Sequence, residues 1–150
     1  MLEGAYKKAP YFNDVYELMK DILCSGKTNL AEYLTYSIKK ICEYLDIDTE
    51  ILISSELKKD NSLKGKEKVV AIVKELGGTT YYNAIGGQEL YSFDYFRENN
   101  LELGFIKTNL IEYKQYNNEF QPYLSIVDIM MFNSKDDVKK MLNSYEIIKE

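Results

Sequence analysis

The strongest constraint on the fold is an alternation of strand-like and helix-like patterns in the middle of the chain. Residues 49–54 and 79–84 are short runs rich in β-branched, aromatic and apolar side chains. Between them, apolar residues recur at helical spacing until Gly77-Gly78. Because a crossover helix returns the chain to the same end of a sheet, the two strands should be parallel. A third run, 101–106, also alternates like a strand. The sequence therefore predicts an α/β fold with a small parallel three-stranded sheet, helices on its faces and a Rossmann-like three-layer arrangement.

Helical patterns account for most of the remaining chain. One runs from Pro10 to about Leu23, and a second follows Asn29, which has Glu32 at capping-box spacing. A short irregular helix is expected between Gly87 and Asn99. After a long polar connection over residues 107–122, two further helices are predicted up to residue 132 and over 134–148. The length of 150 residues suits a single domain.

Composition excludes several classes of function. The chain has no histidine, so Ser-His and Cys-His nucleophile pairs and histidine zinc sites are absent. A net charge of -5 argues against nucleic acid as a partner. No apolar run reaches the roughly 18 residues of a membrane span, so no membrane association is expected. The two cysteines lack metal or redox spacing, and we expect a cytoplasmic protein. No Walker or Gly-x-Gly-x-x-Gly motif indicates a cofactor, and no metal-ligand spacing is present.

The ends of the two predicted strands carry the first group of candidate ligand-binding residues. In an open α/β sheet, ligands bind at the carboxyl ends of parallel strands. At the first strand this places two serines and a glutamate, although they could equally form a turn. At the second, a glycine pair allows close approach of the backbone to a ligand, or simply makes a turn. The candidates are Ser54, Ser55, Glu56, Gly86, Gly87 and, at the end of the same stretch, Tyr91.

A second group of candidates lies in the last third of the chain. Asp128 is a carboxylate within an otherwise apolar helical run, and a buried carboxylate needs hydrogen-bond partners. It could orient a substrate hydroxyl or act as a catalytic base, or it could hold the adjacent loop in place. Ser125 precedes it by one helical turn. Gln115 and Tyr116, in the long connection, are either ligand contacts or ordinary loop residues.

Several short sequence words, in order, resemble the bacterial WbqC-like family. They are the words at 5–12, 29–30, 41–45, 54–57, 64–66, 77–81, 86–87 and 120–129, which together span about 130 positions. The resemblance implies a place among proteins of O-antigen and other surface-polysaccharide synthesis, with a sugar-modifying or acyl-type transferase activity. It also selects Ser125 and Asp128 as site residues. Members usually begin with an additional segment, so we expect this chain to be N-terminally short relative to the family.

Two hypotheses follow for the function. The first is a transferase, or a metabolite-binding protein, that takes a small polar substrate such as a nucleotide-sugar. The second is a non-catalytic accessory or binding subunit that needs a partner to complete its sheet and its site. If the family's first strand is missing, an exposed sheet edge should be covered by another chain, which suggests a homodimer.

Overall fold

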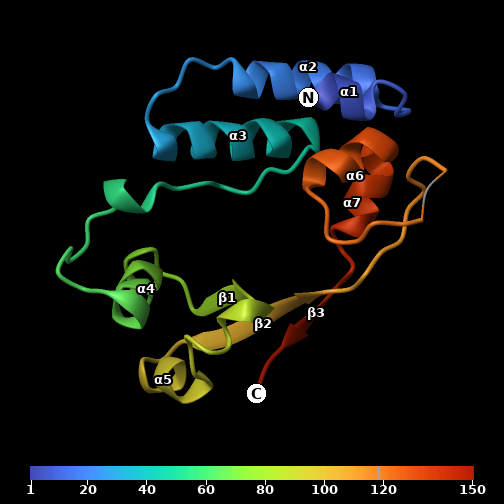
Figure 1. The fold of residues 1–150 in the computed structure, drawn as a ribbon. Helices are drawn as coiled ribbons and strands as arrows, with labels where there is room; N and C mark the ends of the chain where they lie inside the picture. The colour runs from blue at the N-terminus through green and yellow to red at the C-terminus, as the bar shows by residue number, and fades with distance from the viewer. Residues whose placement is uncertain (118) are drawn as a thin grey trace. The chain divides into compact units, whose positions relative to one another are not determined.

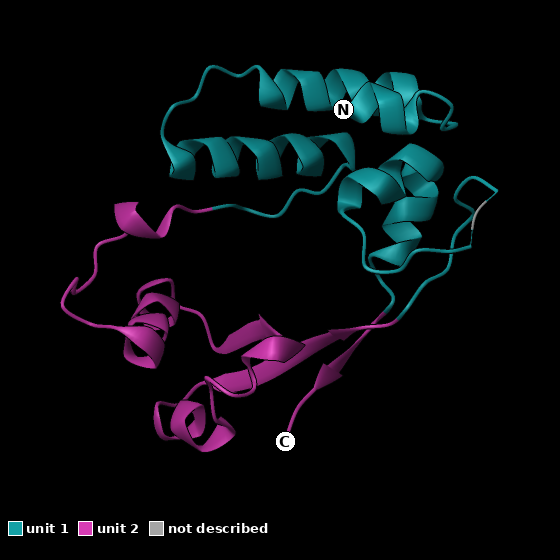
Figure 2. Cartoon of the chain, in the orientation of Figure 1, with its two compact units in different colours: residues 1–51, 110–144 teal, residues 52–109, 145–150 magenta. Residues whose placement is uncertain are grey.

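The computed structural model describes residues 1–117 and 119–150. The chain forms two compact units, shown in Figures 1 and 2. Unit 1 comprises Met1–Ile51 and Leu110–Ser144, and unit 2 comprises Leu52–Asn109 and Tyr145–Glu150. The expectation of a single domain stays a prediction.

Unit 1 is helical. The predicted capping of the second helix is confirmed, because the Asn29 side chain accepts hydrogen bonds from the backbone N–H groups of Ala31 and Glu32. The two helices predicted from apolar periodicity run side by side in Figure 1. A short helix at the N-terminus was not predicted, since one turn is too short to show a period. The helices are α1 (Leu2–Tyr6), α2 (Phe12–Leu23), α3 (Leu30–Tyr44), α6 (Ile126–Phe132) and α7 (Lys135–Met141).

The core of unit 1 forms where α6 packs among the other helices. Val15 of α2, Met130 and Met131 of α6, and Val138 of α7 are buried together. The N-terminal segment is fastened to this core, because the Tyr11 N–H donates to the Met131 carbonyl at 3.1 Å. This core fixes the position of α6, which carries Asp128.

Unit 2 contains a three-stranded sheet in the order β1 (Thr80–Ala84), β2 (Glu102–Thr108), β3 (Tyr145–Ile148). β1 and β2 are parallel, and β3 is antiparallel to β2. Helices α4 (Gly65–Glu75) and α5 (Phe93–Glu98) and the 3₁₀ turns η1 (Ser54–Glu56) and η2 (Ile85–Gly87) complete the unit. Leu103 and Phe105 of β2 pack with Phe96 of α5 and Val70 of α4 in a buried cluster.

The sheet corrects two predictions about its strands. Residues 49–54 are not a strand, and within the described chain no backbone hydrogen bond joins residues 49–52 to another segment. The expected parallel pair with 79–84 is therefore absent, and β1 instead pairs with β2. Conversely, the helix predicted over 134–148 ends at Met141, and Tyr145–Ile148 forms β3. At 49–54 and at 145–148, the apolar content and the local spacing are compatible with a strand and with its absence. Only a pairing partner distant in sequence decides between the two. The sheet is mixed rather than all-parallel, and a Rossmann-like three-layer arrangement stays a prediction.

Candidate functional site: a carboxylate held by two tyrosines

Asp128 lies in the first turn of α6. Ser125 begins this helix, its hydroxyl accepting a hydrogen bond from the Val127 N–H at 3.3 Å. The helix presents apolar side chains to the core, and Asp128 is only 4% exposed. Among the described residues it is the only buried charged side chain. Because desolvating a carboxylate is costly, its hydrogen bonds must supply most of the compensation.

Three donors from distant parts of unit 1 meet on this carboxylate. The Tyr6 hydroxyl donates to Oδ2 at 2.9 Å, and the Tyr113 hydroxyl donates to Oδ1 at 2.6 Å. The Gln115 amide Nε2 also donates to Oδ1, at 3.1 Å. Tyr6 ends α1, whereas the other two belong to the connection after β2. Asp128 therefore joins the N-terminal segment, the connection and α6.

Gln115 fixes the connection itself. Its Oε1 accepts from the Gln121 N–H at 2.9 Å, and its Nε2 donates to the Gln121 carbonyl at 3.1 Å. Tyr116 is tied down separately, since its hydroxyl donates to the Ala5 carbonyl at 3.0 Å and its ring packs edge-on against Phe132. Two of the predicted loop candidates thus have defined structural partners in unit 1.

The electrostatics of the cluster are those of an anion held by neutral donors. Asp128 takes part in none of the ion pairs formed by the described residues. Burial, reinforced by the hydrogen bond to Asp128, raises the pKa of Tyr6 to about 12. The same causes raise the pKa of Tyr113 to about 12. Both tyrosines therefore keep their protons at neutral pH and remain donors.

This arrangement leaves specific chemistry available. A carboxylate offers about four acceptor positions, and the three donors occupy three of them. The Tyr113 hydroxyl already accepts a hydrogen bond from Gln115 Nε2 at 3.4 Å, whereas the Tyr6 hydroxyl only donates among the described residues and can still accept one. A ligand hydroxyl or amine reaching the cluster would therefore meet acceptors belonging to Asp128 and Tyr6.

The remaining candidates belong to unit 2. Ser54, Ser55 and Glu56 form the exposed turn η1. Gly86 and Gly87 lie in η2, directly after β1, which is where a parallel strand presents its carboxyl end. The structure thus groups Gln115, Tyr116, Ser125 and Asp128 in unit 1, and places the other predicted site residues in unit 2.

A second polar cluster lies beside Gly87, the second glycine of the pair. The Asn83 amide donates to the Tyr81 hydroxyl at 3.2 Å, and a Cβ on Gly87 would lie 2.9 Å from the Asn83 side chain. Burial, then the proximity of Tyr91, raises the pKa of Tyr81 to about 12. Gly87 is thus needed for close packing against Asn83, whether or not a ligand approaches it.

Sequence reasoning missed four residues of these clusters, one of which is Tyr81, the partner of Asn83. Tyr6 and Tyr113 were not identified as partners of Asp128, and Asn83 was not identified beside Gly87. Tyr6 lies 122 positions from Asp128 in sequence. No local pattern marks such a pair, although a buried carboxylate in an apolar helix does predict that donors must exist somewhere.

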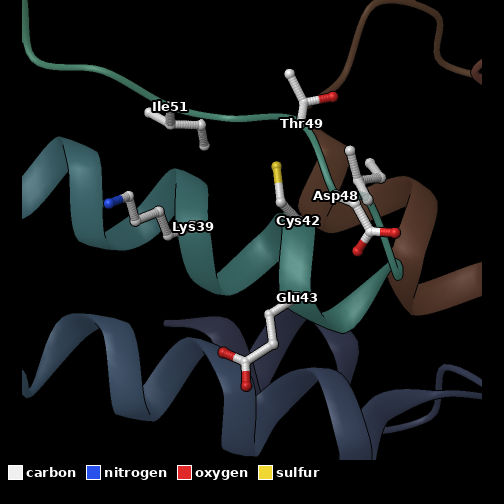
Figure 3. Close-up of a pocket in the computed structure, with 7 residues that line it drawn as sticks. Lys39, Cys42, Glu43, Asp48, Thr49 and Ile51 are labelled. Atoms are coloured by element: carbon white, nitrogen blue, oxygen red, sulfur yellow. The ribbon is translucent and has the colours of Figure 1, made fainter.

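An open depression of about 400 Å³ lies elsewhere on unit 1, shown in Figure 3. It lies between the C-terminal half of α3 and the extended segment that follows. Its charged lining is of mixed sign, with one lysine and two carboxylates. The lining residues are Lys39, Cys42, Glu43, Ile47, Asp48, Thr49 and Ile51.

Two further types of site are not found within the described part of the chain. No group of three or more Cys, Asp or Glu side chains there is placed to hold a metal ion. No helix there is long and apolar enough to cross a membrane.

Fold and site together define a mixed α/β protein with a buried, hydrogen-bonded carboxylate. The chain belongs to the WbqC-like protein family, whose model matches residues 1–140. No curated protein and no solved structure matches it.

Proposed function

We propose that this protein binds a sugar, a nucleotide-sugar or a similar small polar metabolite at the Asp128 cluster, as a transferase-type or metabolite-binding protein of surface-polysaccharide synthesis in the cytoplasm. The class of pathway rests on the resemblance to the WbqC-like family. The position of the site rests on one observation, the buried Asp128 carboxylate with three donors drawn from α1 and from the connection after β2. Charged side chains are almost never fully buried unless they are paired.

The surroundings of Asp128 fit a sugar-like ligand. Hydroxyl-rich ligands are bound by side chains that both donate and accept, and the two tyrosine hydroxyls do both. Aromatic rings also stack on the apolar faces of sugars. Tyr113 packs edge-on with Phe120, and Tyr116 with Phe132, so several rings border the cluster.

Tyr123 is a further candidate ligand contact near the same helix. It is 91% exposed and has a φ of 59°. A tyrosine in the left-handed region is uncommon, and such strain is concentrated at functional positions. Tyr123 precedes the α6 cap by two residues, which makes its exposed ring a candidate contact for a ligand at the cluster.

In the transferase form of this proposal, Asp128 acts on an acceptor hydroxyl. It accepts the hydroxyl proton as the oxygen forms a bond to the group being transferred. The bond between that group and the rest of the donor breaks, and its electron pair leaves with the rest of the donor. Tyr6 and Tyr113 hold the carboxylate in one orientation. Ser125 contributes by starting α6, and thereby sets the position of Asp128.

The accessory-subunit alternative also has an observation in its favour. The three protein donors already satisfy most of the acceptor positions of the carboxylate, which fits a purely structural role. In addition, β1 is an edge of the sheet with no further strand beside it among the residues that the structure describes. In this alternative a second chain covers that edge, and Asp128 only holds unit 1 together.

A ligand screen on matched variants distinguishes the ligand-binding proposal from the accessory-subunit alternative. The wild-type chain, Asp128→Asn and Tyr6→Phe would be screened by thermal shift against nucleotide-sugars and acyl donors. The control is Tyr36→Phe, because Tyr36 donates to exposed Asp21 at the same 2.9 Å found for Tyr6 and Asp128. We expect stabilisation of the wild type and of the control, and at least tenfold weaker binding by Asp128→Asn. If no compound stabilises the wild type, or if Asp128→Asn binds as well as the wild type, the proposed site is wrong.

A further inference from the structure

β1 is one edge of the sheet in unit 2, and its outer side has no strand beside it among the described residues. The direction of its backbone groups follows from one hydrogen bond. The Thr79 carbonyl accepts from the Glu102 N–H of β2, and backbone groups alternate sides along a strand. Residues 79, 81 and 83 therefore face β2. Thr80, Tyr82 and Ala84 direct their N–H and C=O groups toward the free edge.

The two edges of this sheet differ in how they are protected. Natural edge strands carry charges or proline that discourage pairing with another chain. β3, the other edge, has Glu146 within it and Lys149 just after it, and these residues pair with Lys107 and Glu102 of β2. The stretch 77–88, which includes β1, has no charged residue and no proline. The unprotected edge is therefore β1.

The Tyr82 side chain on β1 favours pairing of this edge with another strand. Tyr82 is 44% exposed, and its ring lies over Gly104 of β2, where a Cβ would be 2.7 Å away. This contact holds Tyr82 in place at the centre of the strand. Aromatic residues facing each other across an antiparallel pair are among the more stabilising cross-strand pairs.

We propose that β1 pairs with β1 of a second copy of this chain, antiparallel about a twofold axis at Tyr82. Tyr82 then exchanges two backbone hydrogen bonds with the partner's Tyr82, and Thr80 lies opposite the partner's Ala84. Two sheets of three strands become one continuous sheet. A second copy fits this edge because the pairing is self-complementary: five uncharged residues face the same five, with no like charges opposed.

Ala84 allows a selective test. Its φ of -65° is the value that proline imposes, and its N–H donates only to the side chain of Asn83 within the described chain. Ala84→Pro therefore removes an edge N–H without disturbing the pairing with β2. Thr80→Lys adds a charge to the same edge. The matched control, Tyr145→Lys, adds the same charge to β3, on the side chain face that Thr80 and Tyr82 share.

Light scattering across a concentration series measures the outcome. We expect the wild type and Tyr145→Lys to approach twice the chain mass of 17.5 kDa as concentration rises. The dimers of Thr80→Lys and Ala84→Pro should have dissociation constants at least tenfold higher than that of the wild-type dimer. The circular dichroism of both variants should be unchanged. A wild type that stays at the mass of one chain at every concentration would overturn the proposal, as would equal weakening by the control.

Hydrogen exchange locates the contact. The Tyr82 amide should become protected as the chain associates, whereas the Tyr81 amide, which faces β2, should be protected throughout. Protection of Tyr82 that does not change with concentration would show the edge covered within one chain and contradict the proposal. This inference deepens the accessory alternative, but it does not depend on ligand binding. Failure of the ligand screen and failure of dimerisation are thus separate results.

Discussion

The Tyr113 hydroxyl lies 2.6 Å from Oδ1 of Asp128, the shortest of the three hydrogen bonds on that carboxylate. A hydroxyl donating to an ionised carboxylate makes a stronger bond than one between neutral groups. Because Tyr113 belongs to the connection and Asp128 to α6, this bond holds a loop without regular structure against a packed helix.

Removing the carboxylate should destabilise the protein. Asp128→Ala leaves three donors without their acceptor, and each buried unpaired donor costs roughly 1–3 kcal/mol. We expect a loss of about 3 kcal/mol in the free energy of unfolding, because the tyrosines are only part-buried and can partly bond to water. Urea denaturation measures it. Asp21→Ala, an exposed partner of Tyr36, should change stability by less than about 0.5 kcal/mol. Equal losses of stability in Asp128→Ala and Asp21→Ala would contradict a structural role for the Asp128 hydrogen bonds.

The two tyrosines should be energetically coupled. Tyr6→Phe and Tyr113→Phe each remove one hydrogen bond to a charged group, worth about 1.5–3 kcal/mol. Since both bind one carboxylate, the double variant should not equal the sum of the two single variants. A double-mutant cycle by chemical denaturation tests this. Strict additivity would show that the hydroxyls act independently.

Stability should fall at high pH. The folded pKa of Tyr6 and of Tyr113 is raised to about 12, against 10.0 for an unperturbed tyrosine. The folded state therefore holds these protons more tightly, and the stabilisation is fully present below pH 10. It should be lost as the pH rises from 10 to 12. Denaturation midpoints at stepped pH would show the decline, and the decline should be smaller in the Tyr6→Phe, Tyr113→Phe double variant.

Two glycine substitutions should differ in their effect on stability. Gly104→Ala places a Cβ 2.7 Å from the Tyr82 ring, so overpacking should cost about 1–3 kcal/mol. A Cβ at Gly86 has nothing within 4 Å among the described residues, so Gly86→Ala should leave stability nearly unchanged. Thermal denaturation compares the two. Equal losses of stability in the two variants would contradict the packing role of Gly104.

Much of the secondary structure was predictable because its determinants are local. The cap at Asn29 and the glycine that ends α4 act within one or two turns, and the structure has both of them. The apolar stripe predicted after Asn29 does form a helix, α3, but Leu30, Leu34 and Ile38 of that stripe are exposed. The strands predicted at 79–84 and 101–106 are present as β1 (Thr80–Ala84) and β2 (Glu102–Thr108). Residues 49–54 and 145–148 were assigned wrongly, since a strand exists only where another strand can pair with it.

The residues around Asp128 are enough to predict a lone carboxylate in an apolar helix, and hence a need for hydrogen-bond partners. That these partners are Tyr6, Tyr113 and Gln115 follows from the folded chain alone, because the contacts join residues up to 122 positions apart. Likewise, the residues of β1 predict a strand, but its position at the edge of the sheet depends on which strands pair with each other. Local patterns act over a few residues, whereas burial and pairing are settled by the packing of the whole chain.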